Sequence, residues 1–310
     1  MSTGVFVWSA PPQPADNVAP HVAGAATGVP WLAFQRLAAS VLVCPPSCLP
    51  VVLAAAPDGK RIGAMNRRYI KVLGERNTGT NYLQQLLELN LDADLLPGTV
   101  PPFVPGSAPE FVRDAYFMLT GAANLGWKHA IAPFGNELAR IKKRYPSLLL
   151  VTLTKNPYSW LLSLHRHPYH QRSAVQSLEE FLQSPWPTVR RERHPGPFPN
   201  PVIMWNEKNA SYVTLGQNAP CCNLTYERLL QDPQACLGQI TSEYGVPSRP
   251  GVFRNAQDSA KGERDKGYEQ YRDYYLGERW KAHLSPRIVE VINRDPDKAL
   301  VRHFGYEMLA

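Results

Sequence analysis

The ten residues 74–83 (GERNTGTNYL) constrain the fold of this chain most, because they join an apolar segment to an amphipathic one. The preceding residues 69–73 (YIKVL) predict a short strand, and residues 83–89 (LQQLLEL) predict a helix. A helix that begins here directs unpaired backbone N–H groups and the positive end of its dipole toward the loop. The sequence therefore predicts a strand, a phosphate-sized loop and a helix that together bind an anion.

The glycine spacing of this loop matches that of nucleotide triphosphatases, G-x-x-x-x-G, but Thr80 and Asn81 follow where those enzymes need Lys and Ser or Thr. The lysine contacts the β- and γ-phosphates, and the hydroxyl holds the magnesium ion. The loop therefore favours a smaller, metal-free phosphate group. For the loop taken alone, a plain glycine-containing turn remains the alternative.

A second strand-to-helix segment strengthens the phosphate prediction. Residues 148–154 (LLLVTLT) form a continuous apolar run, which is typical of a parallel strand buried on both faces. Pro157 fits the first turn of a following helix. Lys155 lies at the end of the strand, and Ser163 lies eight residues further on, on the helix. This pair is suited to bind one more phosphate.

These two segments resemble those of the sulfotransferases that use 3′-phosphoadenosine 5′-phosphosulfate (PAPS) as donor. In that family an early strand, loop and helix bind the 5′-phosphosulfate. A later strand ends in Arg-Asn-Pro, followed eight residues on by Ser, and this element binds the 3′-phosphate. The resemblance implies that the donor is bound here by Asn77, Thr78, Gly79, Thr80, Asn81, Lys155 and Ser163.

The chain departs from the common family pattern at two positions. Asn77 stands where many members have a lysine that touches the sulfuryl group, which leaves Arg76 as the neighbouring cation. Lys155 replaces the usual arginine and so lacks the bidentate fork of a guanidinium group.

A third match, Lys128-His129, resembles the Lys-Thr-His segment that supplies the catalytic histidine in the cytosolic branch, but is one residue shorter. An acceptor hydroxyl must lose its proton as it attacks sulfur, and histidine has the pKa best suited to take it. His129 is therefore the expected base, and Glu75 is the alternative, because other branches use a carboxylate. A purely structural histidine also remains open. Lys128 and Arg76 are expected to stabilise charge on the transferred group.

Weaker similarities continue to the C-terminus, so the resemblance spans residues 67–310. Residues 223–233 and 303–307 look like fold markers of the family. In many members a loop covers the adenosine bisphosphate at the position of residues 261–267, which implies contacts from Lys261 and Gly262. The alternative for this charged stretch is a solvated surface loop.

Charge and cysteine content narrow the class of protein. The formal net charge of +7 and pI near 9.1 fit a nucleotide bisphosphate, but fit nucleic acid or an acidic polysaccharide equally well. The family resemblance implies a small-molecule or glycan acceptor and no nucleic-acid partner. The five cysteines are odd in number and lack paired zinc spacing. They indicate reduced thiols in a cytoplasmic protein, with no metal site.

The beginning of the chain has a different composition. Residues 1–60 contain four charged side chains and nine prolines, which predicts a flexible, low-complexity extension over residues 1–64. Residues 37–56 are uncharged and long enough to cross a bilayer, but Pro45, Pro46 and Pro50 interrupt them. A membrane anchor is therefore the minor alternative.

Together these features predict one doubly wound α/β domain over residues 65–310, with a P-loop-like phosphate site at the carboxyl ends of a central parallel sheet. The expected reaction is transfer of a sulfuryl group from PAPS to an acceptor hydroxyl or amine, without a metal. Two alternatives are a nucleotide-dependent kinase and a non-catalytic protein that binds adenosine bisphosphate or polyanions. The acceptor and the oligomeric state are left open.

Overall fold

The computed structural model describes residues 67–105, 107–169, 177–257 and 267–310. The chain divides into two units, Met1–Arg61 and Ile62–Ala310, and all described residues belong to the second. The predicted extension over residues 1–64, the candidate anchor at 37–56, and both Lys261 and Gly262 lie outside the described residues.

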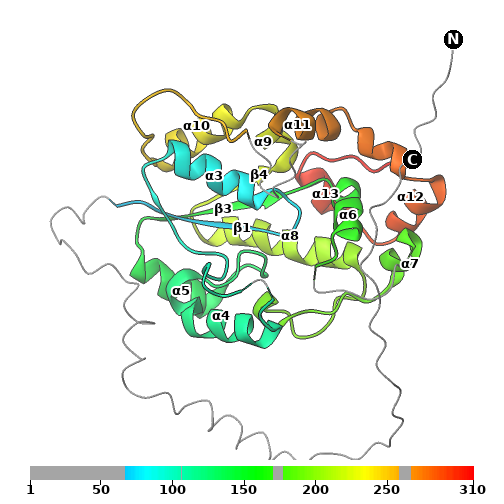
Figure 1. Cartoon of the computed structure of the whole chain (residues 1–310), viewed down its shortest axis with the longest axis horizontal. Coiled ribbons are helices and arrows are strands. Elements are labelled where there is room, and N and C mark those ends of the chain that lie inside the picture. Colours follow the sequence, from blue (N-terminus) through cyan, green and yellow to red (C-terminus); the bar gives the residue numbers. More distant parts are fainter. Residues whose placement is uncertain (1–66, 106, 170–176, 258–266) are drawn as a thin grey trace, which may run out of the picture. The chain divides into compact units, whose positions relative to one another are not determined.

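Four parallel strands form one sheet in the order β2-β1-β3-β4 (Figure 1). Their bounds are β1 Tyr69–Gly74, β2 Asp94–Leu95, β3 Leu148–Thr154 and β4 Cys221–Thr225. Every residue of β3 is buried, as its continuous apolar sequence predicts. The predicted α/β fold with a central parallel sheet is confirmed.

The strand order contains a switch point between β1 and β3. From β1 the chain first adds β2 on one side and then returns to place β3 on the other side. The connections that leave the carboxyl ends of β1 and β3 therefore run in opposite directions. In open α/β sheets such a switch point opens a crevice that holds the ligand.

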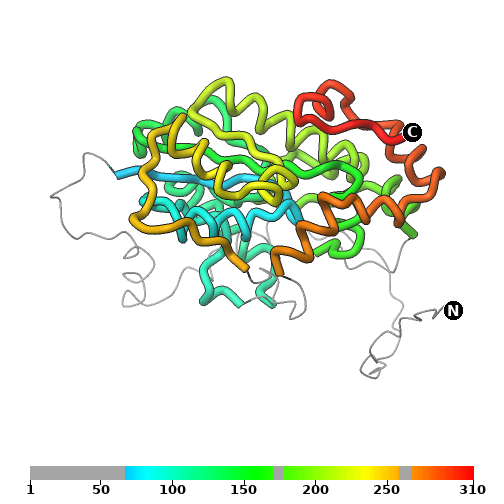
Figure 2. Tube along the Cα trace, turned by 90° about the horizontal axis from the view of Figure 1, so that it is seen from above, coloured from blue at the N-terminus to red at the C-terminus, as the bar shows by residue number. Residues whose placement is uncertain are grey.

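Helices cover both faces of the sheet, as expected for a doubly wound domain. One face carries α3 (Thr80–Asn90), α9 (Tyr226–Gln231) and α10 (Pro233–Tyr244). The opposite face carries α5 (Gly135–Arg144) and α8 (Pro201–Asn218). Figure 2 shows α8 and α3 on opposite sides of the strands.

The alternation of side chains along the strands explains this arrangement. Leu149 and Val151 of β3 point toward the α3 side and share a core with Leu83. Leu150, between them in sequence, points the other way and packs with Tyr212 of α8. A strand that is apolar at every position needs helices on both faces, because successive side chains point to opposite sides.

The remaining elements lie between and after the four strands in the chain. They are α4 Glu110–Asn124, α6 Pro157–Arg166, α7 Leu178–Gln183, α11 Tyr268–Leu276, α12 Pro286–Ile292, α13 Lys298–His303 and the short 3₁₀ helices η2 Arg190–Glu192 and η3 Arg279–His283. The α6 helix begins at Pro157, as predicted, and the Asn156 side chain accepts from Tyr158 N and Ser159 N. In the described part of the chain, no helix combines the length and apolar character needed to cross a membrane.

Candidate functional site

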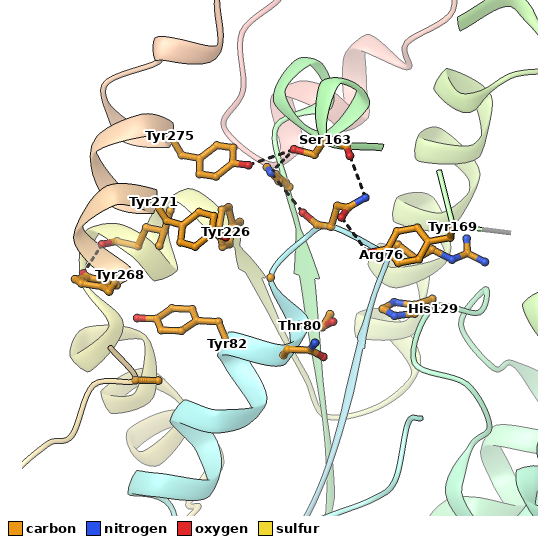
Figure 3. Close-up of a pocket in the computed structure, with 16 residues that line it drawn as sticks. Arg76, Thr80, Tyr82, His129, Ser163, Tyr169, Tyr226, Tyr268, Tyr271 and Tyr275 are labelled. Atoms are coloured by element: carbon orange, nitrogen blue, oxygen red, sulfur yellow. Dashed lines mark hydrogen bonds between the residues drawn. The ribbon is translucent and has the colours of Figure 1, made fainter. Parts of the chain in front are cut away.

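A pocket opens at the carboxyl ends of β1 and β3, at the switch point of the sheet (Figure 3). Tyrosine rings occupy one end of it, and Arg76, His129 and Tyr169 occupy the other. Most of the residues predicted from the sequence line it: Arg76, Asn77, Gly79, Thr80, Asn81, His129, Lys155 and Ser163. Three other predicted residues are buried and do not line the pocket: Glu75, Thr78 and Lys128.

The loop after β1 leads directly into the N-terminus of α3. Gly79 caps the helix in the left-handed region, with φ at 89°. A Cβ at this position would lie 2.4 Å from the Tyr226 ring, so both conformation and space require glycine. The first helical backbone bond runs from Leu83 N to Gly79 O, and no side chain caps the helix. The N–H groups of the first turn are therefore oriented to bind an anion.

The two threonines of the loop differ in position. Thr78 is buried, and its hydroxyl donates to Glu75 O at 2.6 Å, which holds the loop closed on itself. Thr80 is the first residue of α3 and lines the pocket. Thr78 thus acts on the shape of the loop, and Thr80 faces the ligand space.

Lys155 carries a buried positive charge into the pocket. Its ammonium group lies 3.0 Å from Ser163 Oγ and 3.4 Å from Asn77 O, and 3.7 Å from the Tyr275 ring centroid. Within the described ranges, no carboxylate forms an ion pair with it. Its direct contacts are all with neutral groups, and the Glu227 carboxylate, which interacts with it electrostatically, stays beyond ion-pair distance. A buried ammonium without a directly paired carboxylate is poorly compensated, so an anionic ligand would stabilise it.

Asn77 connects the two segments that the sequence predicts to bind phosphate. It adopts φ of 63°, a conformation that asparagine tolerates better than most residues. Its amide nitrogen donates to Ser163 O at 3.3 Å, and its amide oxygen accepts from Tyr169 Oη at 3.0 Å. The loop position itself therefore has no cation, and Arg76 supplies the neighbouring one.

Arg76 belongs to a buried network of four charges. Its guanidinium group pairs with Glu75 at 3.2 Å and with Glu192 at 2.7 Å. The Lys208 ammonium, from α8, pairs with Glu192 at 3.2 Å and also contacts Glu75. Burial opposes the charge of Arg76, but both carboxylates together raise its pKa. Glu75 is thus held between two cations and is not among the residues that line the pocket.

Sequence reasoning missed Glu192 and Lys208. They lie 116 and 133 residues from their partners Arg76 and Glu75 along the chain. No local motif marks either residue, so only the folded chain brings them to the site. Lys208 also donates to His129 O at 2.9 Å, which ties the network to the candidate base.

His129 is oriented by the backbone of β1. Its Nδ1 lies 2.5 Å from Gly74 O, which assigns the proton to Nδ1 and leaves Nε2 as a hydrogen-bond acceptor. Its ring stands at 85° to that of Trp127, with the centroids 5.0 Å apart. Burial and the nearby charges of Lys128 and Arg76 hold its pKa well below the usual 6.5. His129 is therefore neutral near pH 7, in the form that accepts a proton.

Lys128 faces helix α3. Its ammonium group donates to Asn81 Oδ1 and to Gln84 Oε1, both at 2.5 Å. Burial lowers its pKa to about 8, although the Glu88 charge acts in the opposite direction. Lys128 thus positions Asn81, which lines the pocket, and places a titratable positive charge next to the α3 N-terminus.

The tyrosine end of the pocket was not predicted from the sequence. Tyr82 stacks on Tyr268 with ring centroids 5.9 Å apart, and Tyr271 stacks on Tyr275 at 6.4 Å. Tyr226 meets Tyr275 edge to face at 5.1 Å. Flat aromatic surfaces of this kind are suited to bind a heteroaromatic base.

Among the described residues, no group of three or more His, Cys, Asp or Glu is arranged to hold a metal ion.

Among known proteins, similarity to this chain is found with solved structures and not with family models or curated sequences. Neither a protein-family model nor a curated protein sequence matches the chain. The sulfotransferase domain from the curacin biosynthetic pathway is similar at 13% identity and a TM-score of 0.43, covering 79% of this chain and 99% of that domain. Mouse sulfotransferase SULT7A1 complexed with PAP is similar at 14% identity and a TM-score of 0.42, covering 74% of this chain and 82% of that one. A sulfotransferase from Alicyclobacillus acidocaldarius gives 16% identity and a TM-score of 0.39, covering 74% and 97%.

Proposed function

We propose that this protein is a sulfotransferase that moves a sulfuryl group from PAPS to an acceptor hydroxyl or amine. The observation that carries the proposal is the buried ammonium of Lys155, which has no carboxylate partner among the described residues and lies beside the uncapped start of α3. One pocket thus offers two separate positions for anionic groups. PAPS carries anionic groups on both its 5′ and its 3′ oxygens, and its adenine matches the tyrosine end.

Each of the three parts of the donor, the 5′-phosphosulfate, the 3′-phosphate and the adenine, has its own position in the pocket. The backbone N–H groups after Gly79 bind the 5′-phosphosulfate, and Lys155 and Ser163 bind the 3′-phosphate. The adenine lies among the tyrosine rings. Figure 3 shows these rings at the opposite end of the pocket from His129. This placement directs the sulfuryl group toward Arg76 and His129.

The reaction follows from the protonation states of the site. Nε2 of His129 accepts the proton of the acceptor hydroxyl as its oxygen bonds to sulfur. The bond between sulfur and the bridging phosphate oxygen breaks, and adenosine 3′,5′-bisphosphate (PAP) leaves. Arg76 and the N–H groups of the loop stabilise the charge that develops on the leaving phosphate. His129 is favoured over Glu75 because Glu75 is already paired with Arg76 and Lys208.

Two other functions predict different ligands for the same pocket. A kinase would bind Mg-ATP, although Thr80 and Asn81 stand where it needs its lysine and metal-binding hydroxyl. A non-catalytic polyanion-binding protein would bind heparin. Ligands that bind only the folded state raise its thermal stability, so thermal denaturation distinguishes the three. PAP is expected to raise Tm; a rise with Mg-ATP or heparin but not with PAP would refute the proposal.

The lowered pKa of Lys128 predicts the basic side of the pH profile. Below about pH 8 its ammonium is charged and adds to the positive potential that the α3 N-terminus offers an anionic ligand, and above that pH the charge is lost. The kcat/KM for sulfuryl transfer is therefore expected to fall by up to about tenfold per pH unit above 8. Lys128→Arg keeps its charge over this range, so its profile should stay level to higher pH. The matched variant Lys143→Arg, on the exposed side of α5, should retain the fall. A fall near pH 8 that persists in Lys128→Arg contradicts this assignment.

A further inference from the structure

A second cavity, of about 290 Å³, lies between α4, α5 and η2 and shares no lining residue with the pocket described above. Its apolar wall includes Phe117 of α4, Leu125 and Trp127, all buried residues with a side or edge facing this space. Such a wall suits a small molecule with a flat or branched apolar body.

The polar lining of this cavity is strongly positive. Four arginines line it, Arg140, Arg190, Arg191 and Arg193, against one carboxylate, Glu137. Arg140 and Arg190 are exposed, and neither side chain makes a hydrogen bond or ion pair with any described residue. They therefore remain available to an incoming anion.

The other two arginines differ in how far they are neutralised. Arg191 pairs with Glu110 at 2.5 Å and with Asp114 at 2.8 Å, so its charge is compensated. Arg193 pairs with Glu137 through Nη2 at 2.7 Å. The uncompensated positive charge in the cavity therefore comes from Arg140 and Arg190. Arg193 contributes a hydrogen-bond donor that has no acceptor among the described residues.

The Arg193 guanidinium is fixed by hydrogen bonds, but one of its nitrogens has no acceptor among the described residues. Its Nη2 also donates to Leu125 O at 2.6 Å, whereas Nη1 is buried and has no acceptor in the described part of the chain. Gly126 makes this position possible, because a Cβ there would lie 2.6 Å from Nη2. A buried N–H without an acceptor is costly, and an acceptor atom bound in the cavity would remove that cost.

We propose that this cavity is a second binding site, for a small organic anion that carries a carboxylate or sulfate on an apolar body. The acidic group accepts from Arg193 Nη1 and pairs with Arg140 and Arg190, and the apolar body packs on Phe117 and Trp127. The site adjoins the reaction centre through Trp127, since the Arg76 and Arg191 guanidinium groups lie 4.5 and 4.4 Å from its ring centroid.

Calorimetry on the full chain with 2-naphthoate as probe tests the site. The double variant Arg140→Gln/Arg190→Gln is expected to raise the Kd of the probe by roughly 3- to 30-fold, as the loss of two exposed ion pairs typically does. Both side chains are exposed, so the fold should persist. The matched control Arg302→Gln removes another exposed, unpaired arginine and should leave the Kd unchanged. The uncharged probe 2-naphthamide should bind more weakly than 2-naphthoate.

A substitution of the lining carboxylate Glu137 should change the Kd of the probe in the opposite direction. Glu137→Gln should lower the Kd of 2-naphthoate, because it removes the one negative charge among the described lining residues and frees the Arg193 guanidinium. Addition of PAP should not displace the probe, since the two sites share no residue. Equal binding of 2-naphthamide, an unchanged Kd in the double variant, or displacement by PAP would each overturn the proposal.

Discussion

His129→Ala is expected to lower the maximal rate of sulfuryl transfer by about 10²- to 10⁴-fold, the usual contribution of a general base. The affinity for PAP should stay unchanged, because the side chain lies at the opposite end of the pocket from the tyrosines (Figure 3). A loss in kcat without a loss in product affinity is the signature of a group that acts in the transition state. Turnover and PAP titration on the same preparation measure both.

The pH profile provides an independent check of this base. Burial and the charges of Lys128 and Arg76 hold the pKa of His129 well below 6.5. The neutral imidazole therefore persists until the pH falls below this lowered pKa. The acidic limb of kcat/KM should therefore lie below pH 6.5 in the unmodified protein and disappear in His129→Ala. Glu75→Gln is the comparison that decides between the two candidate bases. If it abolishes turnover while His129→Ala retains most of it, the base is the carboxylate.

The double variant Lys155→Ala/Ser163→Ala is expected to weaken PAP binding by about 2 to 4 kcal/mol, or roughly 30- to 1,000-fold in Kd. Each hydrogen bond to a charged group contributes about 1.5 to 3 kcal/mol, and two adjacent contacts are not additive. Adenosine 5′-phosphosulfate lacks the 3′-phosphate, so its affinity should change little.

The comparison of the two ligands guards against a general loss of structure. Lys143→Ala, on the exposed face of α5, removes a lysine far from the pocket lining and should leave both affinities unchanged. Equal losses for PAP and adenosine 5′-phosphosulfate in the double variant would contradict the assignment of Lys155 and Ser163 to the 3′-phosphate.

The parts of the fold that local sequence determines could be predicted. The strand at 148–154, the start of α6 at Pro157 and the loop before α3 follow from apolar runs, proline and glycine, whose effects extend over a few residues. Lys155 and Ser163 could be paired in advance because they lie on one strand-to-helix segment, and their contact at 3.0 Å agrees with that pairing.

The rest of the site depends on contacts between distant segments. Glu192 and Lys208 reach Arg76 and Glu75 only through η2 and α8, and no spacing in the sequence marks them. The tyrosine end joins α3, α9 and α11, which lie far apart in the chain. The tautomer of His129 likewise follows from a contact with Gly74 O, a residue of another segment. Local patterns carry no information on such contacts.

The central claim is that the pocket recognises a nucleotide by its 3′-phosphate, and calorimetry on the unmodified protein tests it most directly. PAP and AMP share the adenine and the 5′-phosphate, and differ in the 3′-phosphate that Lys155 and Ser163 are proposed to bind. PAP is expected to bind at least about 30-fold more tightly than AMP, which corresponds to the lower limit of about 2 kcal/mol expected for the contacts of Lys155 and Ser163 together. Equal affinities for PAP and AMP would contradict the account.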